Sequence, residues 1–465
     1  MLNNITNFFN LIATRKIKTI TNTSDLLPLG TRDPRYTGCY QPTAILACDL
    51  INQVITCVPS IMVLGTGCCS TVRCGNSNIA SCGYSTVSGG YRNTASGYYS
   101  IVSGGRNNTS SGNRSTVSGG YNNNASGYAS TVSGGYNNNA SAYNSTVSGG
   151  YTNTASAYNS TVSGGRENTS SAYYSTVGGG FQNTASGQYS TVGGGYNNTA
   201  CAANSTVSGG QNNTSSCNNS TISGGYGNTA SAYNSTVGGG TQNSASGYIS
   251  TVGGGRSNTA SDDYSIVSGG YNNTSSGQVS TIGGGRNNSS SSSYSTVSGG
   301  YGNNAVNAYT TISGGYRNSA SGYASSVSGG FCNTASNCSS TVGGGRENTA
   351  SGYRSTVSGG YNNTASGYYS FVGGGWSNIA NWNCSTVVGG AFNTASGAYS
   401  GILGGCGNTA SVCNSFIVGS NITATRICAT FVNNLNIMNI PTSNAGLPTK
   451  SVWFDSLSCT LKMVP

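Results

Sequence analysis

Four carboxylates lie in the long central part of this sequence, and pairs of carboxylates are the groups that hydrolyse glycosidic bonds. They are Glu167, Asp262, Asp263 and Glu347. A glycosidase holds its two carboxyl groups within about 10 Å of each other, whereas the two Glu residues stand 180 residues apart. The two Asp residues are neighbours, and we expect them to diverge on a solvated turn. The carboxylates therefore argue against a glycan-cleaving enzyme.

Other catalytic and metal-binding patterns are also missing. The 465 residues include no His, which excludes Ser-His-Asp and Cys-His nucleophiles and His metal ligands. The Gly-Gly-Gly runs, such as 373–375, lack the Gly-Lys-Ser/Thr of a phosphate loop. None of the 16 Cys has the Cys-x-x-Cys spacing that is typical of zinc sites. We therefore expect no enzyme, no cofactor and no metal.

A fifteen-residue repeat organises residues 61–420. With Tyr361 counted as position 1, position 3 is Asn from Asn78 to Asn408 and position 15 is Gly from Gly75 to Gly405. Position 12 is Val or Ile from Val72 to Ile417, and position 5 is Ala or Ser from Ala80 to Ala410. The restricted positions alternate, which is typical of strands with one constrained face. Since the repeat contains no insertion, we expect an all-β fold in which two short strands per unit stack in register as a parallel β-solenoid.

The unbroken Asn column has two interpretations. Asn78, Asn93, Asn363 and their equivalents could form a ladder of amides that hydrogen-bond from coil to coil. Alternatively, they could simply make turns, since Asn tolerates the left-handed backbone region. The sequence leaves both open.

The expected core is very thin, because the inward side chains are mostly Asn, Ala, Ser, Val and Gly. One chain buries little apolar surface per coil, so we expect chains to associate. A homotrimer is the natural form for a fibre.

The segment STVSGGYNNTASG at 355–367 resembles the head repeat of the trimeric autotransporter adhesins, the YadA type. The matching positions are Val357, Gly360, Ala365 and Gly367. The resemblance covers 61–420 and implies a left-handed parallel β-roll assembled as a tight trimer. Gly359 replaces the Ile of that family and the unit is one residue longer, so we expect the trimer contact to differ in detail.

The two ends resemble parts of viral fibres. Residues 439–465 are similar to the terminal segment of many tail-fibre and virion structural proteins, and residues 14–45 are similar to N-terminal modules of viral fibre-like proteins. We therefore predict three parts, which are an attachment or capping module at 1–60, the roll at 61–420 and a cap at 421–465. Solenoids need such caps because an open end exposes strand edges.

The sequence argues against nucleic acid and membranes as partners of this chain. The net charge of +10 is spread without a dense basic run, which argues against nucleic acid. The N-terminus lacks the small-residue cleavage site of a secretory signal, and no apolar run of 18 residues predicts a membrane helix. We expect no membrane insertion.

Two sets of side chains are candidates for specific contacts. Cys201 and Cys217 fall at positions 6 and 7 of adjacent coils, and Cys413 and Cys428 both fall at position 8 if the last coil continues. Such pairs come within disulfide range in stacked strands, with buried thiols as the alternative.

Tyr residues gather at turn positions 1, 8 and 9, as at Tyr361, Tyr368 and Tyr369. These rings could stack on one another between coils, or they could contact glycans on a host surface.

Together these features predict a trimeric structural fibre of a virion surface or an extracellular filament, which presents repeated contacts for attachment. Three alternatives remain. A Thr column at position 11 could bind ice, although Ile101, Ile266, Phe371 and Gly401 interrupt it. The chain could polymerise head to tail into a filament. A glycan-degrading spike is the third alternative.

Overall fold

The computed structural model describes residues 31–32, 40–41, 62–73, 75–434, 441–443, 445–449, 451–455 and 460–463. The chain divides into two compact units, Met1–Gly240 and Thr241–Pro465. In the described residues of both units the regular structure is all β, with no helix. The module predicted at 1–60 lies almost entirely outside the described residues.

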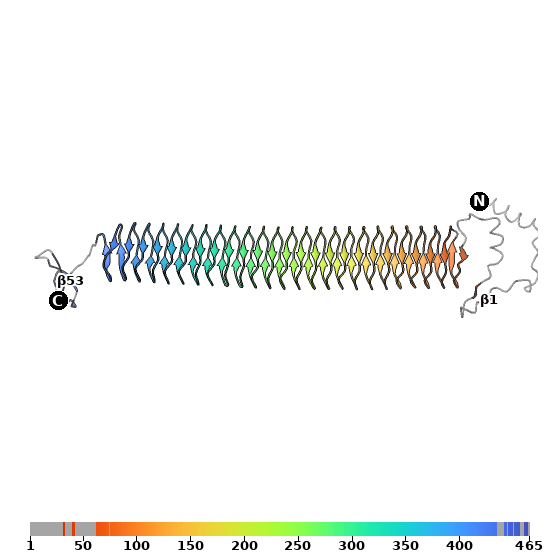
Figure 1. Cartoon of the computed structure of the whole chain (residues 1–465), viewed down its shortest axis with the longest axis horizontal. Helices are drawn as coiled ribbons and strands as arrows, with labels where there is room; N and C mark the ends of the chain where they lie inside the picture. Colours follow the sequence, from red (N-terminus) through yellow and green to blue (C-terminus); the bar gives the residue numbers. More distant parts are fainter. Residues whose placement is uncertain are drawn as a thin grey trace, which may run out of the picture. The chain divides into compact units, whose positions relative to one another are not determined.

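The first unit consists of two parallel ladders of very short strands, drawn as arrows in Figure 1. One ladder uses positions 11 and 12, from β4 (Thr71–Arg73) and β6 (Thr86–Val87) to β26 (Thr236–Val237). The other uses positions 4 and 5, from β5 (Ile79–Ala80) to β25 (Thr229–Ala230). Each strand pairs with the strand one coil away in exact fifteen-residue register, for example Val117 with Val132.

The second unit repeats this arrangement. Its ladder at positions 4 and 5 runs from β27 (Ser244–Ala245) to β51 (Thr423–Ala424), and its ladder at positions 11 and 12 runs from β28 (Thr251–Val252) to β52 (Thr430–Val432). The expected parallel β-solenoid with a fifteen-residue repeat is therefore confirmed in both units.

Among the described residues, three antiparallel pairings lie outside this pattern. In the first unit, β3 (Met62–Leu64) pairs with β4 and covers the first edge of its ladder, and β1 (Thr31–Arg32) pairs with β2 (Tyr40–Gln41). In the second unit, β53 (Val452–Asp455) pairs with β54 (Thr460–Met463). Covering an edge strand satisfies backbone groups that would otherwise invite further pairing.

The last coil differs from the others by one residue. Ala410 pairs with Ala424 and Ile417 with Phe431, a spacing of fourteen residues. The chain has a single Gly, Gly419, where the units from Gly89-Gly90 to Gly404-Gly405 have a Gly pair. Pairing thus continues past residue 420 to Val432, while the predicted cap at 421–465 remains a prediction.

The interior is as thin as expected, but it is more polar than a usual core. Val or Ile at position 12 from Val87 on, Ala at position 5, Ser at position 10 and Asn at position 3 from Asn93 on are buried. Val72 and Asn78, in the first coils, are half-buried. The buried polar groups are paired: in the described residues, only Ser325 Oγ and Ser400 Oγ are buried side-chain N/O atoms without a partner. Buried polar groups are tolerated when their hydrogen bonds are satisfied.

Candidate functional site

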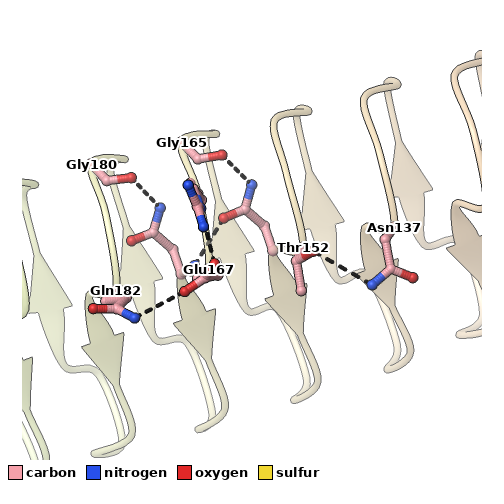
Figure 2. Close-up of polar contacts among 9 residues, drawn as sticks. Asn137, Thr152, Gly165, Glu167, Gly180 and Gln182 are labelled. Carbon is pink, nitrogen blue, oxygen red and sulfur yellow. Dashed lines mark hydrogen bonds and ion pairs between the residues drawn. The ribbon is translucent and has the colours of Figure 1, made fainter.

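The Asn column forms a hydrogen-bonded ladder along each unit. Asn168 Oδ1 accepts the backbone N–H of Asn183 at 2.9 Å. Asn168 Nδ2 donates to the carbonyl of Gly164 at 2.9 Å and to that of Gly180 at 2.8 Å. Figure 2 shows the bond to Gly180 and the equivalent bond to Gly165 one coil away. The Asn168 side chain thus links the glycine turn that precedes it in the chain to the equivalent turn of the next coil.

The three Asn residues singled out from the sequence follow the same rule. Asn93 donates its backbone N–H to Asn78 Oδ1 at 3.0 Å, and Asn363 donates to Asn348 Oδ1 at 2.9 Å. Direct bonds between the amides are fewer; one runs from Asn363 Nδ2 to Asn348 Oδ1 at 3.2 Å. The contacts are therefore those of a ladder between coils. In most of its bonds, the Asn side chain pairs with backbone groups and not with another Asn side chain.

The left-handed residues other than Gly are at positions 2 and 9 instead of position 3. Position 2 has φ of 58° at Asn362, and position 9 has φ of 55° at Tyr369. None of the three residues Asn78, Asn93 and Asn363 has a positive φ. At these two positions the backbone N–H donates to the preceding coil, as from Tyr369 to the Tyr353 carbonyl at 2.9 Å, whereas strand residues donate to the following coil.

The other structural residues named from the sequence lie inside the coil or at its corner. Val357 and Ala365 are fully buried. Gly360 has φ of +85°, and a Cβ there would lie 2.2 Å from the carbonyl oxygen of Gly375. Position 15 therefore requires Gly for two reasons, the left-handed backbone and the close approach of the next coil.

Arg and aromatic side chains share the position 1 column. The Arg286 guanidinium lies 5.1 Å from the ring centroid of Tyr271 and 5.7 Å from that of Tyr301. Arg346 lies in the same way between Phe331 and Tyr361, at 5.2 and 5.4 Å. Each Arg is thus held by cation–π contacts on both sides. Where no Arg intervenes the rings stack directly; the pair Tyr121 and Tyr136 in the first unit is 5.2 Å apart.

Rings at positions 8 and 9 form a second aromatic edge. Tyr128, Tyr143, Tyr158 and Tyr173 stack in succession with centroids 4.6–5.0 Å apart. Stacking buries only part of each ring. The residues proposed for surface contact remain accessible, with 40% of Tyr361, 59% of Tyr368 and 51% of Tyr369 exposed.

The carboxylates of the repeat make local contacts. Glu167 accepts hydrogen bonds from Arg166 Nε and from Gln182 Nε2, both at 2.9 Å, as Figure 2 shows for Gln182. These bonds hold the pKa of Glu167 below its ordinary value. Asp262 Oδ1 accepts the backbone N–H of Asp263 at 2.8 Å, as expected for a turn.

The outward faces of the strands are hydroxyl-rich over most coils. Positions 4 and 11 are mainly Thr, and these side chains are half-buried in most coils. Because the strands are paired in register, these hydroxyls form straight columns along each unit. Thr71 Oγ1 donates to Thr86 Oγ1 at 3.2 Å in one such column.

An apolar cluster replaces the hydroxyl pattern near the end of the second unit. Position 13 is Ser or Gly in most coils but becomes Val388, Leu403 and Val418 in three successive ones, with 47, 59 and 43% exposed. Phe416, at position 11, is 47% exposed beside them. We call these four residues the apolar cluster. Contiguous exposed apolar groups commonly mark a contact surface.

The cysteines proposed as disulfides are free thiols in the structure: Cys201, Cys217, Cys413 and Cys428. Cys428 differs from the expected register. Since the last coil is one residue shorter, Cys428 takes position 9, with φ of 55°, and its backbone N–H donates to the Cys413 carbonyl at 3.2 Å. The two disulfide pairings remain predictions.

The described part of the chain offers neither a cluster of metal ligands nor a membrane-spanning helix. There, no three His, Cys, Asp or Glu side chains are placed to bind a metal ion. Across the same residues we find no helix capable of crossing a bilayer.

Comparison with known families identifies an adhesin repeat. The family model of the ubiquitous surface protein adhesin repeat matches residues 85–97, 115–127 and 355–367. Each match runs from the Ser of position 10 through the Gly and Asn corner to position 7. No curated protein matches the chain. The matches and the solenoid fit an adhesin-like structural fibre, and they suggest a surface-exposed, non-enzymatic protein.

Two features of these surfaces were not anticipated from the sequence. The pairing of Arg with aromatic rings could have been found by reading position 1 as a column, because Arg256, Tyr271, Arg286 and Tyr301 alternate there. The apolar cluster is likewise visible once position 13 is read as a column.

Proposed function

We propose that this protein is a trimeric fibre of a virion surface or extracellular filament, which attaches to its target through contacts repeated in every coil. The observation that carries the proposal is the in-register stack, which presents the same two turn edges at each coil. Weak contacts at identical sites combine into strong attachment when many engage together. The adhesin repeat matches support the attachment role.

The apolar cluster supports association of the chains. A stack with one Val or Ile and one Ala or Ser per coil buries little apolar surface alone. Burial of Val388, Leu403 and Val418 against the same residues of two further chains would add to it, because a threefold axis along the coils brings identical faces together.

Sedimentation and imaging of the full-length chain test the proposed assembly. We expect a mass of three chains and straight rods in electron micrographs. A monomer that persists at all concentrations would overturn the trimer. End-to-end filaments from purified protein would favour the polymerising alternative.

Attachment is tested with beads that carry the full-length chain, flowed over cultured cell monolayers. We expect retention to rise steeply with the number of chains per bead, since avidity depends on simultaneous contacts. Retention equal to that of uncoated beads at every density would contradict the attachment role.

Ice binding is a second candidate, which the hydroxyl columns favour. Thr at positions 4 and 11 forms flat, regularly spaced arrays over most coils. The full-length chain should then cause thermal hysteresis in freezing solutions, and freezing behaviour equal to that of albumin at the same concentration would remove this candidate.

A further inference from the structure

Positive charge gathers on one turn edge of the second unit. Arg256, Arg286 and Arg346 occupy position 1, and Arg317 occupies position 2 of an intervening coil; all four are exposed. Glu347 is the only carboxylate that the sequence places at these two positions of the unit. We call positions 1 and 2 of this unit the basic edge.

The guanidinium groups on the basic edge are held in place. Arg286 and Arg346 each lie between two rings, and Arg256 lies 5.7 Å from the Tyr271 centroid. The ion pair of Arg346 with Glu347 uses Nε, at 3.0 Å, and leaves 61% of the Arg side chain exposed. Groups that are ordered before binding lose less entropy when a ligand arrives.

The spacing of the charges is regular. Position 1 residues of successive coils form parallel bridges, as Tyr271 does with Arg286 and Arg286 with Tyr301. One coil therefore advances by the spacing of adjacent strands, about 4.8 Å. Arg256 and Arg286 are two coils apart, roughly 9.6 Å along the stack. Arg317, at position 2, and Arg346 continue the two-coil interval. One sugar of an extended polysaccharide is close to one coil in length.

Aromatic rings fill the intervals between these charges. Tyr271, Tyr301, Phe331 and Tyr361 belong to the same column, and between 38 and 40% of Tyr271, Phe331 and Tyr361 is exposed. Because Arg groups lie over faces of these rings, the accessible part is mainly the ring edge, which provides apolar contact area with a polar tip on Tyr. A ligand whose charged groups alternate with less polar sugar rings would place the charges at the Arg residues and the sugar rings at the exposed aromatic edges.

The opposite edge of the unit lacks the pattern. Its charged residues at positions 7 to 9 are Asp262, Asp263, Arg354 and Arg426, whose charges cancel. The charge excess is therefore a property of one edge.

We propose that the basic edge binds a linear anionic polysaccharide that lies along the coils, with its acidic groups at the Arg residues and its sugar rings against the intervening aromatic side chains. The inference rests on the proposed attachment function and names the class of ligand for it.

Heparin binding by the full-length chain tests this inference, with neutral dextran and duplex DNA as comparison ligands. Wild-type protein should bind heparin in a salt-sensitive manner and leave dextran unbound. The double variant R286Q/R346Q should weaken heparin binding about tenfold, as expected when charge-assisted contacts are lost from a preordered site.

The matched control is R354Q/R426Q, which removes two charges from the opposite edge of the same unit. Arg354 also contacts rings, at 5.2 Å from Tyr353 and 5.7 Å from Tyr369, so the local environment is similar. This control should change heparin binding less than about twofold. Circular dichroism and melting temperature should show that both variants fold.

Three results would overturn the inference. Equal weakening by the two double variants would show that net charge alone matters. DNA binding as tight as heparin binding, with the same loss in R286Q/R346Q, would indicate a general polyanion surface. Absence of heparin binding would also overturn it, and the bead assay would then show whether attachment itself remains.

Discussion

At the scale of single residues, the position 3 Asn shows how a coil with so little apolar volume becomes well packed. One Asn side chain accepts a backbone N–H from the next coil and donates to two Gly carbonyls. Corner backbone groups that would be costly to bury unpaired are thereby satisfied. Polar pairing along the stack takes the place of a thick apolar core.

Removing one amide from this ladder should destabilise the first unit. Asn168→Ala leaves the Gly164 carbonyl and the Asn183 N–H without a partner, at a cost of about 3 kcal/mol. The Gly180 carbonyl loses one of its two donors and keeps the Arg166 N–H at 2.8 Å. Urea unfolding measures the loss. The control Asn139→Thr introduces the residue most coils have at position 4 and should change stability by less than about 0.5 kcal/mol. Equal stability of the two variants would contradict the structural role.

Adjacent glycines should respond differently to the same change. Gly360→Ala adds a Cβ that meets the Gly375 carbonyl oxygen at 2.2 Å with φ of +85°, so we expect a loss of at least about 3 kcal/mol. Gly359→Ala adds a Cβ with no atom within 4 Å and should be nearly neutral. The melting temperatures of the two variants measure this difference. Similar melting temperatures would contradict the close contact between Gly360 and the next coil.

The Glu167 carboxylate should titrate below the usual range for Glu. Its hydrogen bonds to Arg166 and Gln182 lower its pKa. The folded state therefore gains stability above the ordinary Glu pKa and loses this contribution as the pH falls through the lowered pKa. Carbon-detected NMR titration measures the shift. Arg166→Gln should raise the pKa toward the ordinary value; an unchanged pKa in that variant would assign the shift to another cause.

At the scale of the elements, each coil is two strands joined by turns that contain left-handed residues. The alternation of restricted positions predicts the strands, and the absence of insertions predicts their register, so this part of the fold is readable from sequence. The left-handed positions were not readable, because position 9 holds Tyr, Ala, Val and Arg as well as Asn. Stacking hydrogen bonds impose that conformation on residues that do not favour it.

A β-branched residue in a left-handed turn should be replaceable with a gain in stability. Val279 has φ of 58° and is 39% exposed. Val279→Asn should stabilise the protein by about 1 kcal/mol, because Asn tolerates this backbone region better. The reverse change at Asn219, whose φ is also 58°, should cost a similar amount. Melting temperatures that move the other way would exclude this explanation.

At the scale of the whole molecule, the proposed trimer requires a contact surface between chains. The apolar cluster is the surface whose composition departs most from the hydroxyl pattern of the other coils. If it lies in the trimer contact, Leu403→Ser should shift the sedimentation equilibrium toward monomer by roughly tenfold in dissociation constant. Tyr368→Ser, with the same 59% exposure on a turn edge, serves as the control and should leave the equilibrium unchanged. Loss of association in both variants would place the contact elsewhere.

The sequence by itself determined the coil: its length, its two strands, and the identity of its buried positions, because stacking in register makes every unit obey the same constraints. The tertiary structure decided which contacts the side chains of each repeat position make with the neighbouring coils. Only the stacked coils bring Asn168 within 2.9 Å of the Asn183 N–H and interleave Arg286 with aromatic rings. They also set the fourteen-residue pairing of the final coil, in which Cys428 takes position 9. These features depend on contacts between residues about fifteen positions apart, whose geometry exists only once the coils lie on one another.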